Sequence, residues 1–284
     1  MSTALRQEHF GPYKLVRTLG NAHGATRYAV LCSRTDTNYM LYRFEHITNV
    51  KERRALFNAL LKMSTLKHAH LLNIESVSYD DNGRLCVVTP YTGNHDGLVT
   101  LDQLLNIRDG KLGEVESTRA LGHLLDAIKC AHKHEIYNGQ INPDDILVDR
   151  YGCLQIQLYG FETIAHRSIN QNPTQSERAM LITDEIRSVV DLAYTMMTGL
   201  KATDDRIAPS RVIKKLDKNW DTWFDIGLDP IDGFDSVEHA INALPTNPNC
   251  AQWLTTKSPR MPQVHIGSML RRFRTSPSTS RTQR

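Results

Sequence analysis

Apolar residues in the first ninety positions form short alternating runs, interrupted by one stretch with helical spacing. Runs rich in β-branched and aromatic residues predict strands at 13–19, 28–33, 39–44, 72–79 and 85–89. A helix is predicted over 50–66, where four apolar residues recur on one face: Leu56, Leu60, Met63 and Leu66. The small-residue segment 20–25 joins the first two strands, and the turn-prone segment 80–83 predicts a hairpin between the last two.

After Pro90 the spacing of apolar residues lengthens to about 3.6. Helices are predicted at 101–105, 116–134, 185–198, 220–226 and 236–244. The helix over 185–198 ends at Gly199, a residue that readily adopts the left-handed cap conformation. A second hairpin, with strands at 146–148 and 154–156, is predicted around the turn 149–152. The order indicates an α+β chain with a small β-rich lobe followed by a larger helical lobe.

The composition changes at Pro245, beyond which Pro, Ser, Thr, Asn and Arg predominate. Residues 257–284 carry seven Lys or Arg and no Asp or Glu, so the first 256 residues have a net charge of −4 although the whole chain has +3. A mildly acidic domain with a basic tail disfavours nucleic acid as the main partner. Two Ser-Pro pairs in the tail, at Ser258 and Ser276, are either phosphorylation sites or ordinary tail sequence.

The hydrophobic share of the chain, 40% of its 284 residues, suits a globular protein with a substantial core. No apolar run approaches the roughly 18–20 residues that span a bilayer, and residues 1–12 carry no apolar signal-peptide core. The five cysteines are isolated and form no C-x-x-C motif. We therefore expect a cytoplasmic protein with reduced thiols, no membrane-spanning segment and no secretion signal.

Several segments, in this order, resemble the eukaryotic-type Ser/Thr protein kinase domain, particularly its bacterial branch. The segment 127–149 resembles the kinase catalytic loop, and 88–91 resembles the hinge. The segments 194–199 and 229–236 resemble later parts of the helical lobe. The resemblance implies a bilobal protein-kinase-like fold, with an N-lobe at 10–90, a C-lobe at 91–245 and a flexible tail at 246–284. It also assigns to Glu185 the role of an acidic helix-start residue that anchors the catalytic loop.

The chain departs from the kinase pattern at the positions that perform the chemistry. The catalytic aspartate of the loop falls at Gln140, and an amide is not a usable base near neutral pH. The loop lysine falls at Asn142, whereas the metal-binding loop asparagine falls at Asp145, which could still hold a metal. The Asp-Phe-Gly motif reads Leu158-Tyr159-Gly160, and leucine has no lone pair for magnesium.

The nucleotide-binding positions of the N-lobe are also altered. The resemblance places the strand lysine at Arg43, the small residue that faces adenine at Leu41 and the helix glutamate at Ala59. The glycine-rich loop keeps Gly20 but has alanine at 22 and 25, and Arg27 replaces an apolar residue after the loop. The remaining nucleotide contacts implied by the resemblance are Arg43, Gly20, Thr92 and Leu147, together with Asp145 for metal. Of these changes, Arg27 and Leu41 are expected to crowd the purine site.

Two histidine pairs, His68/His70 and His132/His134, have the spacing of metal ligands. Because no third group of ligands is evident beside them in the sequence, ordinary positions at helix ends are the favoured interpretation.

The sequence favours a pseudokinase: a kinase-like domain without phosphoryl transfer that acts as a scaffold or allosteric regulator. The expected partner is a protein, either a kinase or a kinase substrate. No cofactor is expected, although weak ATP binding, with or without magnesium, stays open. The alternative is an enzyme with a remodelled site that transfers phosphoryl or nucleotidyl groups, with Asp145 as the metal ligand and Arg43 on phosphate.

Overall fold

A computed structural model of the chain describes residues 8–92, 98–161, 163, 173–203 and 205–248. The predicted tail therefore lies outside the described residues from position 249 onward, as does most of the segment that follows Gly160. Within the described residues, no helix is long and apolar enough to cross a membrane.

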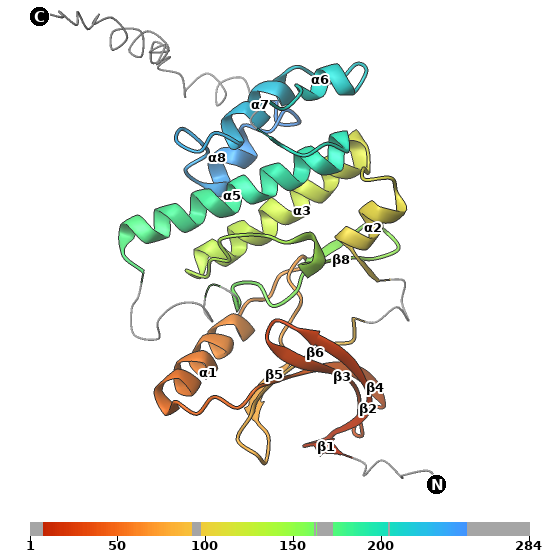
Figure 1. The fold of residues 1–284 in the computed structure, drawn as a ribbon, viewed down its shortest axis with the longest axis vertical. Coiled ribbons are helices and arrows are strands. Elements are labelled where there is room, and N and C mark those ends of the chain that lie inside the picture. Colours follow the sequence, from red (N-terminus) through yellow and green to blue (C-terminus); the bar gives the residue numbers. More distant parts are fainter. Residues whose placement is uncertain (1–7, 93–97, 162, 164–172, 204, 249–284) are drawn as a thin grey trace, which may run out of the picture.

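The N-lobe is a curled antiparallel sheet flanked by one helix (Figure 1). Its six strands lie in the order β1-β2-β3-β4-β6-β5. Their bounds are β1 His9–Phe10, β2 Tyr13–Ala22, β3 Ala25–Cys32, β4 Thr37–Phe44, β5 Ser76–Tyr79 and β6 Leu85–Pro90. Helix α1, Val50–Ser64, follows β4 and begins at Asn49, whose side chain accepts hydrogen bonds from the backbone N–H groups of Lys51 and Glu52. The helix and four of the five strands predicted for this lobe are confirmed. The strand predicted over 72–79 is shorter and covers only Ser76–Tyr79, and the short strand β1 is added.

The turn between β2 and β3 is formed by two residues with positive φ, His23 (53°) and Gly24 (68°). Two consecutive left-handed residues give the tight hairpin that suits twisted strands. Gly20 also has a positive φ, 84°, at a point where the register of β2 against β3 shifts. The segment that resembles a glycine-rich loop is therefore a hairpin with His23 at its tip.

The C-lobe is built around two long helices, α3 and α5, which lie side by side (Figure 1). The helices of this lobe are α2 Leu101–Ile107, α3 Glu114–Lys133, α5 Gln175–Thr198, α6 Pro209–Val212, α7 Asn219–Gly227 and α8 Val237–Asn242. Its small three-stranded sheet consists of β7 Val99–Thr100, β8 Ile146–Val148 and β9 Leu154–Ile156. Gly199 caps α5 in the left-handed conformation, as predicted.

One C-lobe helix begins ten residues earlier than its apolar pattern predicts. Helix α5 starts at Gln175, where Thr174 and Glu177 form a reciprocal capping box. The first turns of this helix are mostly exposed, so residues 175–184 carry no strong apolar face. Glu185 consequently lies in the middle of a helix rather than at its start.

Candidate functional site

A cavity of about 900 Å³ lies between the two lobes. It is lined by the β2–β3 hairpin, by β4, by the segment after β6 and by the segment around the 3₁₀ turn at Pro143–Asp145. Six of the residues that the resemblance singles out line this cavity: Ala22, Arg27, Thr92, Asn142, Asp145 and Leu147. Gly20, Gln140 and Leu158 are not among its lining residues. This cavity is where the resemblance implies a nucleotide site.

Strand β4 presents Met40 and Tyr42 to this cleft. Met40 lines the cavity, and Tyr42 belongs to the buried core that continues into the C-lobe. Leu41 instead packs on the opposite face of the sheet with Val30 and Val88. Because successive side chains of a strand point to opposite faces, the expected placement of Leu41 and Arg43 in the cleft is wrong by one position.

Arg43 lies on the outer face of the N-lobe sheet. Its guanidinium bonds to the carboxylate of Glu8 at 2.8 Å and lies 3.5 Å from that of Asp80. The same guanidinium stacks over the ring of Tyr28, 4.9 Å from the ring centroid. These contacts hold Arg43 away from any phosphate in the cleft, so its assignment as a nucleotide contact is corrected.

Tyr42 is the residue that occupies the inner position of the strand. Its hydroxyl donates to Oε1 of Gln157 at 3.1 Å, across the interface between the lobes. Tyr42 is fully buried, and burial raises the pKa of its hydroxyl to about 12; Arg27 opposes this shift, and Asp145 adds to it. The inner position of β4 therefore carries a neutral hydroxyl with a fixed acceptor.

Asp145 receives a side chain from the N-lobe. His23, at the tip of the β2–β3 hairpin, places Nε2 3.3 Å from Oδ1 of Asp145, and the two side chains are 8% and 18% exposed. The His23 ring also lies edge-on to Phe161, which packs against Phe44 at a centroid distance of 4.9 Å. We call the His23–Asp145 contact the latch. The latch places the imidazole of His23 against the carboxylate of Asp145, which the sequence predicts as the remaining metal ligand.

Leu158 is buried, with 4% of its surface exposed, and its backbone has a positive φ of 41°. Its side chain belongs to the main hydrophobic core. A positive φ is uncommon for a residue other than glycine, and the side chain of Leu158 carries no atom that could bind a metal. The Asp145 carboxylate, in turn, is already in contact with His23; Asp144 is the other carboxylate that lines the cavity.

Glu185 anchors the segment that resembles the kinase catalytic loop. Its buried carboxylate accepts hydrogen bonds from the Asn138 backbone N–H at 3.2 Å and the Tyr159 hydroxyl at 2.5 Å, and it lies 3.0 Å from Nε2 of His132. Burial and the adjacent carboxylate raise the pKa of Tyr159 well above its usual range, so its hydroxyl stays a donor. We call these four residues the anchoring network. It gives Glu185 the position of the loop anchor implied by the resemblance.

Asn138 extends this network toward the following segment. Its Oδ1 accepts from the backbone N–H of Gly160 at 2.7 Å, its Nδ2 donates to the carbonyl of Gln140, and its carbonyl accepts from the Thr163 hydroxyl. The Gln140 side chain is exposed. The loop is thus firmly positioned, but the residue at its catalytic position is a solvent-facing amide.

Helix α1 offers no carboxylate to the cleft. Ala59 is half-buried, and Glu52 lies at the helix start, where its Oε1 accepts from the side chain of Asn49 at 3.0 Å. Within the described residues, the ion pairs of Arg43 are with Glu8 and Asp80, neither of which belongs to α1. The sequence analysis did not identify His23 and Gln157, which line the cavity, or Tyr42, which bonds to Gln157.

No protein-family model matches the chain. Among curated proteins, it is similar to CBL-interacting protein kinase 9 from Oryza sativa subsp. japonica, with 24% identity over 164 residues that cover 57% of this chain and 35% of the relative. CBL-interacting serine/threonine-protein kinase 3 from Arabidopsis thaliana is 23% identical over 159 residues, which cover 55% of this chain and 35% of the relative. The matched regions thus span about a third of the length of these relatives.

Among solved structures, a mutant form of the kinase domain of Mycobacterium tuberculosis PknI superposes with a TM-score of 0.63 at 18% identity. The match covers 89% of this chain and 99% of the other. A further structure of the PknI kinase domain gives a TM-score of 0.61 at 18% identity, with 84% and 96% covered. The chain therefore has a protein-kinase-like α+β fold. Its assignment to the bacterial branch stays a prediction, because the sequence relatives named above come from plants.

Proposed function

We propose that this kinase-like domain is a pseudokinase, which does not transfer phosphoryl groups and acts by binding a protein. The proposal rests on the identity and contacts of the side chains in and beside the cleft. Tyr42, bonded to Gln157, stands at the inner position of β4; His23 caps Asp145; and Leu158 is an apolar core residue. Phosphoryl transfer depends on positioned cations and metal ions, and these residues supply neither.

The binding role is supported by the contrast between an eroded cleft and an intact framework. The anchoring network is complete, with hydrogen bonds from several elements to one buried carboxylate. The plant relatives are named as kinases that interact with another protein, CBL. For this chain, we propose a protein partner, either an active kinase or a kinase substrate, on which the domain acts as a scaffold or allosteric regulator in the cytoplasm.

A phosphotransfer assay tests the proposal. The full chain is incubated with radiolabelled ATP, a general kinase substrate and either magnesium or manganese. We expect no incorporation above that of heat-denatured protein. Turnover that depends on metal and is abolished by Asp145→Asn would contradict the proposal. The matched control is Asp232→Asn, which changes an exposed carboxylate elsewhere in the C-lobe.

One observation favours a second candidate, a metal-independent anion or nucleotide site. The cavity holds the guanidinium groups of Arg17 and Arg27, and the Nε of Arg27 is buried without a hydrogen-bond partner. A phosphate group could pair with that guanidinium in place of a metal ion. Such a ligand would make the cleft a regulatory or remodelled catalytic site. In a thermal-unfolding assay, this candidate predicts stabilisation by ATP that persists in EDTA and is lost in Arg27→Gln.

A further inference from the structure

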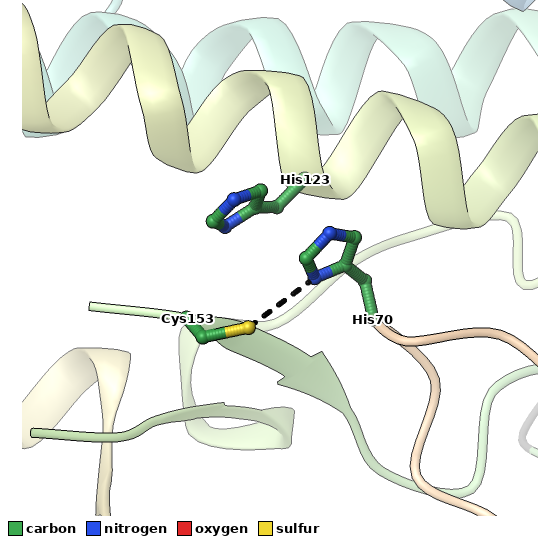
Figure 2. Close-up of side chains that lie close together, drawn as sticks. All are labelled: His70, His123 and Cys153. Carbon is green, nitrogen blue, oxygen red and sulfur yellow. Dashed lines mark hydrogen bonds between the residues drawn. The ribbon is translucent and has the colours of Figure 1, made fainter. Parts of the chain in front are cut away.

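A cluster of three potential metal ligands lies outside the cleft: His70, His123 and Cys153 (Figure 2). They come from three segments, the connection between α1 and β5, helix α3, and the turn before β9. Of the two histidine pairs in the sequence, His68/His70 and His132/His134, the first contributes His70 to this cluster, although the sequence shows no third ligand beside it. The fold supplies the further ligands, since His123 and Cys153 are distant in sequence from His70.

The distances between the three side chains are close to those of a tetrahedral metal site. One ligand atom from each residue lies within 4.8 Å of the others. The Sγ of Cys153 lies 3.7 Å from Nδ1 of His70. In tetrahedral zinc sites, with bonds of about 2.3 Å to sulfur and about 2.0–2.1 Å to nitrogen, neighbouring sulfur and nitrogen ligands are about 3.6 Å apart. The Sγ of Cys153 and Nδ1 of His70 are therefore already at about the separation found in a zinc site.

His123 provides an independent indication that something is missing from this cluster. Its Nδ1 is buried and has no hydrogen-bond partner. Buried polar atoms of this kind are uncommon in folded proteins and call for an explanation. The His123 ring stacks on that of His70 with a centroid distance of 4.0 Å. Because the lone pairs of an imidazole lie in the plane of its ring, the His123 ring would have to turn out of this stack to share an ion with His70.

The cluster is accessible and its backbone is fixed. Cys153 also lines a cavity of about 300 Å³, which provides a route for an ion from solvent. His70 lies in a segment tied to β9 by two backbone hydrogen bonds, Ile156 N–H to His70 O at 3.0 Å and Leu72 N–H to Ile156 O at 2.9 Å. The three side chains are each partly buried. A rigid, partly enclosed site of this kind limits the reorganisation that binding would require.

We propose that His70, His123 and Cys153 bind one zinc ion, with water or a partner's side chain in the fourth position. Imidazole and thiolate are the ligands that zinc favours, and three protein ligands leave one position open. Binding displaces the thiol proton of Cys153 to solvent. Nδ1 of His70 gives up its hydrogen bond to the Leu154 carbonyl, and its proton is replaced by one on Nε2 through exchange with solvent, so that the neutral ring binds the metal through Nδ1. The ion would join the α1–β5 connection to the C-lobe. This site does not depend on the state of the nucleotide cleft.

Zinc competition tests the site directly. The untagged full chain, kept reduced with a phosphine, competes for zinc with a chromogenic chelator. We expect about one zinc per chain, and affinity at least tenfold weaker in Cys153→Ser, His70→Gln and His123→Gln. The matched controls Cys130→Ser and His134→Ala change residues outside the cluster and should bind as the unaltered chain does. Cobalt(II) should give a thiolate charge-transfer band that Cys153→Ser removes.

Thermal unfolding of each variant without metal separates lost ligands from lost folding. Equal zinc affinity in the three cluster variants and the unaltered chain would overturn the proposal. So would a cobalt complex of the unaltered chain without a thiolate band, or no zinc binding by the folded chain.

Discussion

The anchoring network around Glu185 and the cleft around Asp145 lie on neighbouring parts of the C-lobe, and both are polar in a kinase-like fold. In the anchoring network, a buried carboxylate meets a donor from the backbone of Asn138 and another from Tyr159. In the cleft, the positions for cations and metal ligands carry a tyrosine, a leucine and a carboxylate capped by histidine. The comparison separates the polar contacts that the fold requires from the polar groups that catalysis requires. Hydrogen bonds that position the loop stabilise the protein whether or not the loop performs chemistry.

The largest effect is expected from breaking the anchoring network. Glu185→Ala leaves the Tyr159 hydroxyl and the Asn138 N–H buried without an acceptor, so the free energy of unfolding should fall by about 3–5 kcal/mol. Denaturant unfolding measures this change. Glu238→Gln, at an exposed carboxylate of α8, should change stability by less than about 0.5 kcal/mol. A loss below about 1 kcal/mol for Glu185→Ala would mean that the network is not a structural anchor.

Restoring a metal ligand to the cleft should lower the free energy of unfolding without restoring metal binding. Leu158→Asp removes a buried apolar side chain and places a carboxylate in the core, so we expect a loss of about 2–4 kcal/mol. Magnesium at millimolar concentration should not recover it. Recovery of stability by magnesium, measured in the same denaturant titrations, would show that the cleft still holds a metal site.

The hydrogen bond between the lobes should contribute a smaller amount. Tyr42→Phe leaves Oε1 of Gln157 without this donor in a buried position, so the free energy of unfolding should fall by about 1–2 kcal/mol. Tyr28→Phe is the matched control on the outer face of the same sheet, with an expected change below about 0.5 kcal/mol. Equal effects from the two substitutions would remove the special role assigned to Tyr42.

The smallest effect is expected on the outer face of the N-lobe, and it depends on pH. Although burial acts in the opposite direction, hydrogen bonds from Arg84 lower the pKa of Asp80 below its usual value of 3.8. Because the pKa of Asp80 is lower in the folded state, its ionised carboxylate stabilises the fold at pH values above the unfolded pKa. This stabilisation disappears as the pH falls below about 4. Asp80→Asn should therefore reduce stability at pH 7 by about 1 kcal/mol and much less near pH 3. An equal loss at both pH values would contradict this assignment.

The positions of most elements could be predicted from the sequence, because apolar periodicity is strong wherever one face is buried. Strand β4 shows where this signal fails. All residues from Met40 to Phe44 are buried, since the inner face meets the core between the lobes and the outer face packs against Phe10 and Val30. With both faces apolar, alternation cannot reveal which residues face the cleft. The sequence pattern therefore does not distinguish Arg43 from Tyr42 as the residue that faces the cleft.

Other features could not be derived from local patterns because they depend on tertiary contacts. The capping box at Thr174 and Glu177 was visible in the sequence and could have corrected the start of α5. The latch required knowing that a hairpin tip reaches the opposite lobe. The cluster of His70, His123 and Cys153 required knowing how three distant segments pack. In contrast, the predicted changes at Gln140 and Leu158 rest on the local sequence alone, because neighbouring motif residues set their alignment.

Thermal unfolding of the full chain with ATP and magnesium tests the central claim most directly. A ligand at 100 times its dissociation constant stabilises a protein by about 2.7 kcal/mol, which corresponds to a rise in Tm of about 5–10 °C for a domain of this size. We predict no magnesium-dependent rise. A rise of this size that requires magnesium and is lost in Asp145→Asn would contradict the account, because it would show that the latched carboxylate still binds a metal–nucleotide complex.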